Sequence, residues 1–203
     1  MVFEDAVASN LFAQICGSRL RNYIACTNTG SLSGGHLKNL ADISKKLPEL
    51  QNVIFLPDGD LARTWHHPPK NLLALPGDAR PETMVYRHLF QMQDRDPFWK
   101  TIGPTYSRQY AITSQGGTAI ERGDDKDWVK DWFRNQASHW GRRNKKVFDS
   151  WINSNKPDCL RFCRAFLKLL KGRYKGDMPK DVIARTIKRI AGDGGCERPA
   201  TRA

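Results

Sequence analysis

Short apolar runs alternate with helix-like segments over the first ninety of the 203 residues. Four runs predict strands: Val2-Phe3 at the start, followed by "NYIACT", "NVIFL" and "NLLAL". Apolar residues at helical spacing predict helices over 5–16 and 36–46, and Pro81 begins a third helix. The order β-α-β-α-β-β-α is typical of a parallel sheet flanked by helices, so the sequence predicts an α/β fold.

The second half of the chain follows a different pattern. After residue 124 no strand pattern is visible, and apolar residues recur at helical spacing in two stripes: Trp128, Val129, Trp132 and Phe133, then Leu160, Cys163, Leu167 and Leu170. We therefore divide the chain into an α/β domain over 1–100, an irregular linker over 101–125 that is rich in Gly, Thr and Ser, a helical extension over 126–191 and a disordered tail over 192–203.

The charge balance indicates a partner that carries phosphates. Lys and Arg number 33 against 21 Asp and Glu, which gives a net charge of +12. No apolar run reaches the ~20 residues of a membrane span, and the N-terminus lacks the layout of a signal peptide. We therefore expect no membrane partner and a cytoplasmic location. The five cysteines are scattered without a C-x-x-C pair, so neither a disulfide framework nor a zinc knuckle is predicted.

Acidic residues follow three of the predicted strands: Glu4-Asp5, Asp58-Gly59-Asp60, and Asp78 with Glu82. In an open parallel sheet the functional crevice lies beyond the carboxyl ends of the strands. Carboxylates gathered there repel one another unless a cation lies between them. Because no Cys or His accompanies them, these oxygen ligands favour Mg²⁺ or Mn²⁺. A metal site within a basic protein suits phosphodiester chemistry.

These segments also carry a family resemblance. "VFEDAVASNLFAQI", the glycine loop "GSLSGG" and "VIFLPDGD" resemble the three parts of a TOPRIM domain, the topoisomerase-primase fold. They are most similar to the TOPRIM part of the OLD-family (overcoming lysogenization defect) nucleases and related ATPase-coupled antiphage endonucleases. "LLALPGDARPETMVYRHL" resembles the segment that comes next in those proteins, and "VFDSWINSN" with "FCRAFLKLL" is similar to their helical C-terminal extension. The resemblance covers most of residues 1–172.

The resemblance implies roles for individual acidic residues. Glu4 matches the glutamate that acts as a metal ligand or general base, and Asp58 and Asp60 match the paired aspartates that hold the metal. These three are the implied catalytic residues. Asp5 fits the Glu-Asp pattern of the group, and Glu82 is a weaker candidate ligand for a second metal ion.

The resemblance also implies a glycine turn and a basic group at the scissile phosphate. Gly34 and Gly35 correspond to the turn that lets a phosphate or the metal approach the backbone. The basic side chain is expected after the fourth strand, and four candidates remain open: Arg80, Lys100, Arg108 and Lys126.

The chain departs from the family pattern at its start. Only Met1, Val2 and Phe3 precede Glu4, whereas a mean strand has ~5 to 6 residues. The OLD-type proteins carry an ATPase module before their TOPRIM domain, and this sequence contains none. We therefore expect the chain to be the nuclease piece of a split system or a truncated product, with an ATPase domain or subunit as partner; a homo-oligomer is left open.

Several motifs have structural alternatives. Asp-Gly after an apolar run is a common turn, and Glu4-Asp5 and Glu82 stand where acidic residues stabilise the start of a helix. "GSLSGGHLK" is spaced like a phosphate-binding loop, but His36-Leu37 replace the required Lys and Ser/Thr, so we expect no ATP hydrolysis. His66-His67 are expected to be exposed rather than to bind metal.

One basic run is a candidate for contact with nucleic acid. "WGRRNKKVF" is either a solvated helix face or a surface that contacts a phosphate backbone through Arg142, Arg143, Lys145 and Lys146. The nearby Trp128 and Trp132 lie four residues apart, which predicts a core stripe before a platform for base stacking.

Two functional hypotheses follow. The first is a Mg²⁺- or Mn²⁺-dependent endonuclease of TOPRIM type that cleaves nucleic acid, with DNA as the expected substrate. The second is a non-catalytic nucleic-acid-binding or docking module that assembles with an ATPase partner. A nucleotide-binding α/β domain of another kind is disfavoured by the missing phosphate-loop lysine. The acidic set favours the nuclease, and the short first strand favours the docking module.

Overall fold

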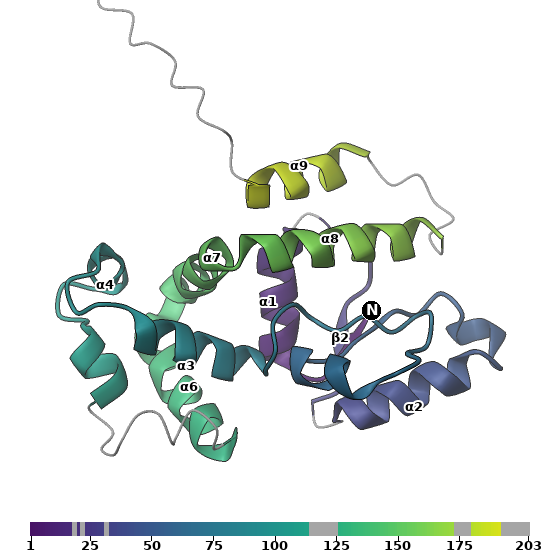
Figure 1. The fold of residues 1–203 in the computed structure, drawn as a ribbon, viewed down its shortest axis with the longest axis horizontal. Helices are drawn as coiled ribbons and strands as arrows, with labels where there is room; N and C mark the ends of the chain where they lie inside the picture. The colour runs from purple at the N-terminus through teal and green to yellow at the C-terminus, as the bar shows by residue number, and fades with distance from the viewer. Residues whose placement is uncertain (18–19, 21–22, 31–32, 114–125, 173–179, 192–203) are drawn as a thin grey trace, which may run out of the picture.

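The structure is a computed structural model that describes residues 1–17, 20, 23–30, 33–113, 126–172 and 180–191. Figure 1 shows a small α/β part around the N-terminus and a group of helices at the opposite end, with the long helix α8 running from α7 along the α/β part. The first part contains β1 (Val2–Phe3), α1 (Ala6–Cys16), β2 (Thr27–Asn28), α2 (Gly34–Ser44), η2 (Pro48–Leu50), β3 (Phe55–Leu56) and η3 (Gly59–Thr64). The remainder is helical, with α3 (Pro81–Gln91), α4 (Pro97–Ile102), the π-helical turn η4 (Gln109–Thr113), α6 (Lys126–Trp140), η5 (Gly141–Arg143), α7 (Asn144–Ser154), α8 (Lys156–Lys171) and α9 (Lys180–Ala191).

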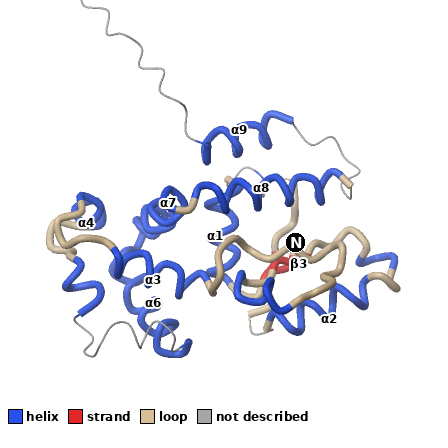
Figure 2. Tube along the Cα trace, in the orientation of Figure 1, coloured by secondary structure: helices blue, strands red, loops and turns tan. Residues whose placement is uncertain are grey.

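The sheet confirms the predicted α/β class and is small. Three parallel strands lie in the order β2-β1-β3, with Val2 opposite Thr27 and Phe55, and Phe3 opposite Asn28 and Leu56. Figure 2 shows how little of the chain is strand. Because all three strands run the same way, their carboxyl ends lie at one edge of the sheet.

The second, third and fourth predicted strands are all shorter than expected, and of "NVIFL" only Phe55 and Leu56 are in β3. Of "NYIACT", only Thr27 is in β2, because the described residues before it form a turn and a bend. "NLLAL" keeps a single bridge between Leu72 and Phe55. It nevertheless runs alongside β3, since Phe55 N–H donates to Asn71, Leu73 N–H to Phe55 and Leu75 N–H to Pro57, at 2.9, 3.0 and 2.9 Å.

The two faces of the sheet pack against different helices. Side chains alternate along a strand, so Phe55 and the bridging Leu72 pack on one face with Leu37 and Ala41 of α2. On the other face, the residues that follow along each strand, Phe3 and Leu56, join the larger core. Three helices predicted from the sequence are present as α1, α2 and α3. Each begins within two residues of the predicted start, which was 5, 36 or 81.

The larger core is continuous from the α/β part into the helices of the second half. It contains Phe3 and Phe12, and it extends through Trp132 and Phe166 to Ile190. Phe12 contacts Phe166 of α8 edge to face, with ring centroids 5.1 Å apart. The helices of 126–191 thus bury the outer surface of α1 rather than forming a separate core.

Trp132 of the predicted tryptophan stripe is a core residue, as expected. Trp132 is fully buried, its ring lies 4.9 Å from that of Tyr86, and its indole N–H donates to Ala111 at 2.7 Å. Ala111 belongs to η4, so the described part of the expected linker, 101–113, is largely helical. Residues 114–125 and the expected tail 192–203 lie outside the described residues. In the part of the chain that is described, no helix has both the length and the apolar character to cross a membrane.

Candidate metal centre

Glu4 and Asp58 meet at the carboxyl edge of the sheet. Glu4 follows β1 directly, and Asp58 lies two residues beyond β3. Glu4 Oε1 accepts a hydrogen bond from the backbone N–H of Asp58 at 3.0 Å. The register of β1 and β3 therefore brings together two carboxylates that are 54 residues apart in the sequence.

Asp58 carries the strongest electrostatic perturbation of the site. Its side chain is 2% exposed, and no described residue donates a hydrogen bond to Oδ1. Burial, followed by the charges of Glu4, Asp5 and Glu82, raises the pKa of Asp58 well above its usual range. A buried carboxylate among like charges is costly unless a positive charge is placed beside it.

Gly59 lets the loop between the two aspartates lie against the following segment. A Cβ at this position would lie 2.6 Å from the carbonyl oxygen of Gly77 and 3.0 Å from that of Leu75. Both neighbours are backbone, so they have little freedom to move aside. The glycine of Asp-Gly-Asp is therefore required by close packing of two backbones, which the turn alternative alone does not explain.

Gly34 has a similar requirement at the start of α2. A Cβ there would lie 1.8 Å from Leu61 Cδ1 and 2.5 Å from Glu4 Oε1. The Glu4 carboxylate is thus held against the N-terminal turn of an eleven-residue helix, where the helix dipole favours negative charge. At Gly35 a Cβ would meet only Ser33 Oγ, at 3.7 Å. The structure therefore gives the two predicted glycines different roles.

Asp5 is the N-cap of α1. Its Oδ1 accepts from the N–H of Ala8 at 2.9 Å, which is the capping role weighed as its alternative. The charge of Asp5 also raises the pKa values of Glu4, Asp58 and Glu82. Asp5 therefore belongs to the electrostatic environment of the acidic cluster, defined here as Glu4, Asp5, Asp58, Asp60 and Glu82.

The pKa values of Glu82 and Glu4 are also raised, with burial as the main cause. Glu82 is 5% exposed in the first turn of α3, and its Oε2 has no hydrogen-bond partner among the described residues. Burial and then the charge of Asp5 raise the pKa of Glu82. The pKa of Glu4 is raised overall, because the effect of burial outweighs that of the hydrogen bond from the Asp58 N–H, which lowers it. The charge of Asp60 also raises it.

Of the four candidate basic residues, the structure brings Arg80 to the acidic cluster. Its Nε lies 4.0 Å from Asp60 Oδ2, and its charge lowers the pKa values of Glu4 and Glu82. Arg108 instead donates to the carbonyl of Phe90 and reaches Asp94. Lys100 is an exposed residue of α4, and the side chain of Lys126 lies outside those described.

One basic residue near the cluster was not predicted. The charge of Lys130, in α6, lowers the pKa of Glu82 in α3. The sequence offers no signal for this pair, because α6 and α3 come together only through core contacts such as the ring pair of Tyr86 and Trp132. Asp78, which also follows the fourth predicted strand, lies 3.8 Å from Arg87.

The basic run after α6 has a structural role at two of its four positions. Arg143 Nη1 donates to the carbonyl of Ile102, and Lys146 Nζ donates to that of Thr101 at 3.2 Å. These carbonyls end α4, where basic groups stabilise a helix. Arg142 and Lys145 are exposed. His66 and His67 are also exposed, as expected.

The acidic cluster has the donor chemistry of a hard-cation site without a closed ligand set. Its oxygens are carboxylates, which suit Mg²⁺ or Mn²⁺. Among the residues described, no three Asp, Glu, His or Cys side chains are grouped as metal ligands. Orientation of at least one carboxylate would therefore have to change on binding.

A comparison with known proteins found no family model, no curated protein and no solved structure that matches the chain.

Proposed function

We propose that this chain is a divalent-metal-dependent nuclease of the TOPRIM type that cleaves phosphodiester bonds of nucleic acid, with DNA as substrate. The observation that carries the proposal is the Asp58 carboxylate, which is 2% exposed, lacks a described donor at Oδ1 and lies among other acids. A charge in that position needs a cation. The net charge of +12 supports a polyanionic substrate.

The residues present fit Mg²⁺ or Mn²⁺ by donor chemistry. Asp58 and Glu4 would hold the ion, with Asp60 on the same loop and Glu82 across the cluster as further ligands. The ion would supply stabilisation of charge on the phosphate and activation of the attacking water. Asp5 keeps one oxygen in the cap of α1 and contributes through its charge.

The chain's own residues would orient the site and balance its charge. The N–H of Asp58 orients Glu4, whose raised pKa makes it a better proton acceptor than an ordinary carboxylate. Arg80 lies beside Asp60 and is placed to offset negative charge that develops on the phosphate. We expect an ATPase domain or subunit to act with the chain, as in the family that its motifs resemble.

The test is cleavage of supercoiled plasmid by the purified chain with Mg²⁺ or Mn²⁺. We expect cutting that depends on the metal and is lost in the Asp58→Ala/Asp60→Ala variant. The matched control is Asp94→Ala/Asp131→Ala, which removes two exposed carboxylates, paired with Arg108 and Arg134, that do not belong to the acidic cluster. Cutting that survives the first pair, or is lost equally in both, would contradict the proposal.

The second candidate is a non-catalytic nucleic-acid-binding or docking module that assembles with an ATPase. Burial of Asp58 and Glu82, at 2% and 5% exposure, favours it, because a substrate phosphate needs access to the ligands. Binding of DNA without cleavage, even with a cognate ATPase present, would select this function over the nuclease.

A further inference from the structure

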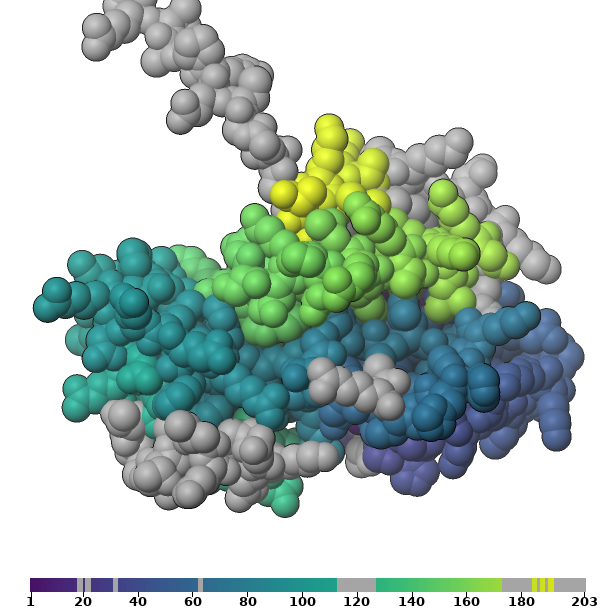
Figure 3. All heavy atoms as spheres, viewed as in Figure 1, coloured from purple at the N-terminus to yellow at the C-terminus, as the bar shows by residue number. Residues whose placement is uncertain are grey.

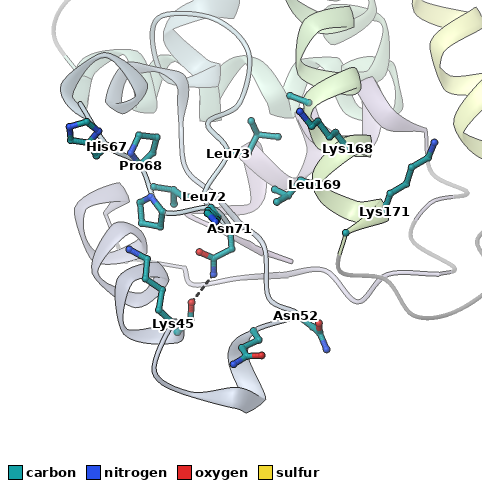
Figure 4. Close-up of a pocket in the computed structure, with 16 residues that line it drawn as sticks. Lys45, Asn52, His67, Pro68, Asn71, Leu72, Leu73, Lys168, Leu169 and Lys171 are labelled. Carbon is teal, nitrogen blue, oxygen red and sulfur yellow. Dashed lines mark hydrogen bonds between the residues drawn. The ribbon is translucent and has the colours of Figure 1, made fainter.

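A large hollow lies away from the acidic cluster. It has a volume of 1440 Å³ and is lined by Gln51 and Asn52 before β3, by 67–73, by the end of α2 and by the last turns of α8. Asn52 precedes β3 and Asp58 follows it, so the hollow lies toward the amino end of β3. Figure 4 shows Lys45 on one side of the hollow, Lys168 on the other, and Asn71 and Leu72 between them.

The charged groups around this hollow are all basic. Lys45, Lys70, Lys168 and Lys171 line it together with His67, and no Asp or Glu does. Lys45 is paired with Asp42 at 2.7 Å. Lys70, Lys168 and Lys171 are exposed and form no ion pair within the described part of the chain. The local field is therefore strongly positive, and an anion that enters meets no acidic wall.

A second hollow of 420 Å³ continues the first. The two share Pro68, Leu72, Leu73 and Ala165 in their linings. The second adds aromatic surface from Trp65 and Phe162 and the ion pair of Asp158 with Arg161. The combined hollow, which we name the α8 groove, lies between the segment 65–77 and α8; Figure 3 shows the α8 surface bordering that of the preceding segments.

The α8 groove ends close to the loop of the acidic cluster. Pro76 and Gly77 line its far end, and the Gly77 carbonyl packs against Gly59, between the two aspartates. A chain-like ligand lying in the groove would therefore extend from the lysines toward the proposed site of cleavage.

We propose that the α8 groove binds a single-stranded stretch of nucleic acid, with its phosphates along Lys70, Lys168 and Lys171 and its bases against the apolar and aromatic lining. This inference rests on the proposed function for the identity of the substrate. A lysine track beside aromatic surface is the usual arrangement for single-strand binding. At 1440 Å³ the larger hollow exceeds the ~300–1,000 Å³ of small-molecule pockets, which favours a polymer.

Stabilisation of the C-terminal end of α8 explains only some of the lysines that line the groove. Lys168 and Lys171 occupy the last turn of α8, where positive charge favours the helix. Lys70 lies in a loop with no helix end to stabilise, yet it lines the same hollow. Lys70 and Lys168 are therefore the best pair to substitute.

The experiment measures fluorescence anisotropy of labelled oligothymidylate and of a labelled duplex with the full chain in EDTA, so that binding is separated from cleavage. The variant is Lys70→Glu/Lys168→Glu, and the control is Arg95→Glu/Lys188→Glu, two exposed basic residues outside the groove. Thermal unfolding midpoints equal to that of the parent establish that the variants fold. If Lys70→Glu/Lys168→Glu does not fold, Lys70→Gln/Lys168→Gln replaces it in the binding measurement.

We expect the groove variant to lose at least about tenfold in affinity for the single strand, and the control to lose far less. The slope of log K against log salt should become shallower by about 1.4, at ~0.7 for each phosphate contact removed. Equal losses in both variants, tighter binding of the duplex, or displacement of the strand by polyglutamate at matched charge would overturn the proposal.

The plasmid assay separates this inference from the nuclease. If the parent never cuts but binds the strand through Lys70 and Lys168, the nuclease falls and the groove stands. If the parent cuts with metal while the groove variant binds and cuts as the parent does, the groove proposal alone falls.

Discussion

The two ends of β3 carry opposite charges in opposite environments. Beyond its carboxyl end, Asp58 and Glu82 are buried and lack described donors at one oxygen each. Before its amino end, Lys70 and Lys168 are exposed around an open hollow. A buried charge raises the free energy of the folded state, whereas an exposed one is stabilised by water in both the folded and unfolded states. We therefore expect the acidic end to govern stability and the basic end to govern encounter with a polyanion.

The largest expected effect comes from the backbone that shapes the acidic end. Gly59→Ala places a Cβ 2.6 Å from the Gly77 carbonyl oxygen, so we expect a loss of about 3 kcal/mol in the free energy of unfolding. Urea denaturation measures it. Gly35→Ala is the control, because its Cβ meets only Ser33 Oγ at 3.7 Å and alanine favours a helix by about 1 kcal/mol. Equal effects at both positions would show that the loop is not tightly packed.

Removal of the most buried charge should stabilise the fold. In EDTA at neutral pH, Asp58→Asn should raise the free energy of unfolding, because burial and the neighbouring acidic charges raise the pKa of Asp58 and so disfavour its charged form in the folded state. The exposed Asp42, paired with Lys45, provides the contrast: Asp42→Asn should cost less than about 1 kcal/mol. If Asp58→Asn instead lowers the free energy of unfolding, the Asp58 carboxylate stabilises the folded state without a metal ion, which contradicts the prediction.

The same buried carboxyl sets the pH dependence. The pKa of Asp58 is raised in the folded state, so between the unfolded value and the folded one the folded chain binds more protons, and stability falls as the pH rises through this window. The advantage of Asp58→Asn over the parent should therefore shrink as the pH is lowered from about 7 toward the unfolded value near 3.9. Burial lowers the pKa of His88, which opposes this trend, but His88 is present in both proteins. Urea denaturation across this range tests it; a constant difference would remove Asp58 as the cause.

Two substitutions at Asp5 distinguish its role as the N-cap of α1 from the effect of its charge on the acidic cluster. Asp5→Ala removes the bond to the Ala8 N–H and should cost about 1 kcal/mol. Asp5→Ser keeps a capping oxygen while removing a charge that raises the pKa of Asp58. Thermal unfolding should therefore place Asp5→Ser at or above the parent and Asp5→Ala below it. The reverse order would show that the charge of Asp5 is favourable.

The smallest expected effect lies at the basic end. Lys70→Ala/Lys168→Ala should change the free energy of unfolding by less than about 0.5 kcal/mol, because both side chains are exposed and make no ion pair within the described residues. Urea denaturation of this variant beside Asp58→Asn compares the two ends directly. A large loss would show that the lysines hold 65–77 against α8.

Sequence patterns predicted which helices and strands are present better than they predicted the lengths of the strands. Helical spacing placed α1, α2 and α3, because a helix is fixed by contacts three and four residues apart. "NYIACT" and "NLLAL" were predicted as full strands, but a strand depends on a neighbour that sequence does not display. Residues 101–113 were expected to be irregular, whereas 109–113 form η4, whose Ala111 carbonyl accepts a hydrogen bond from the distant Trp132.

The sequence by itself determined that acidic residues follow the first and third strands of a predicted parallel sheet, and hence that Glu4 and Asp58 lie at one edge of it. Local order suffices for this, since strand direction assigns each carboxyl end. Only the tertiary structure decided that Asp58 is buried, that Arg80 and Lys130 rather than Lys100 or Arg108 act on the acidic cluster, and that Lys70 and Lys168 face one groove. Burial and charge proximity depend on how distant segments pack, and neither is encoded in the spacing of neighbouring residues.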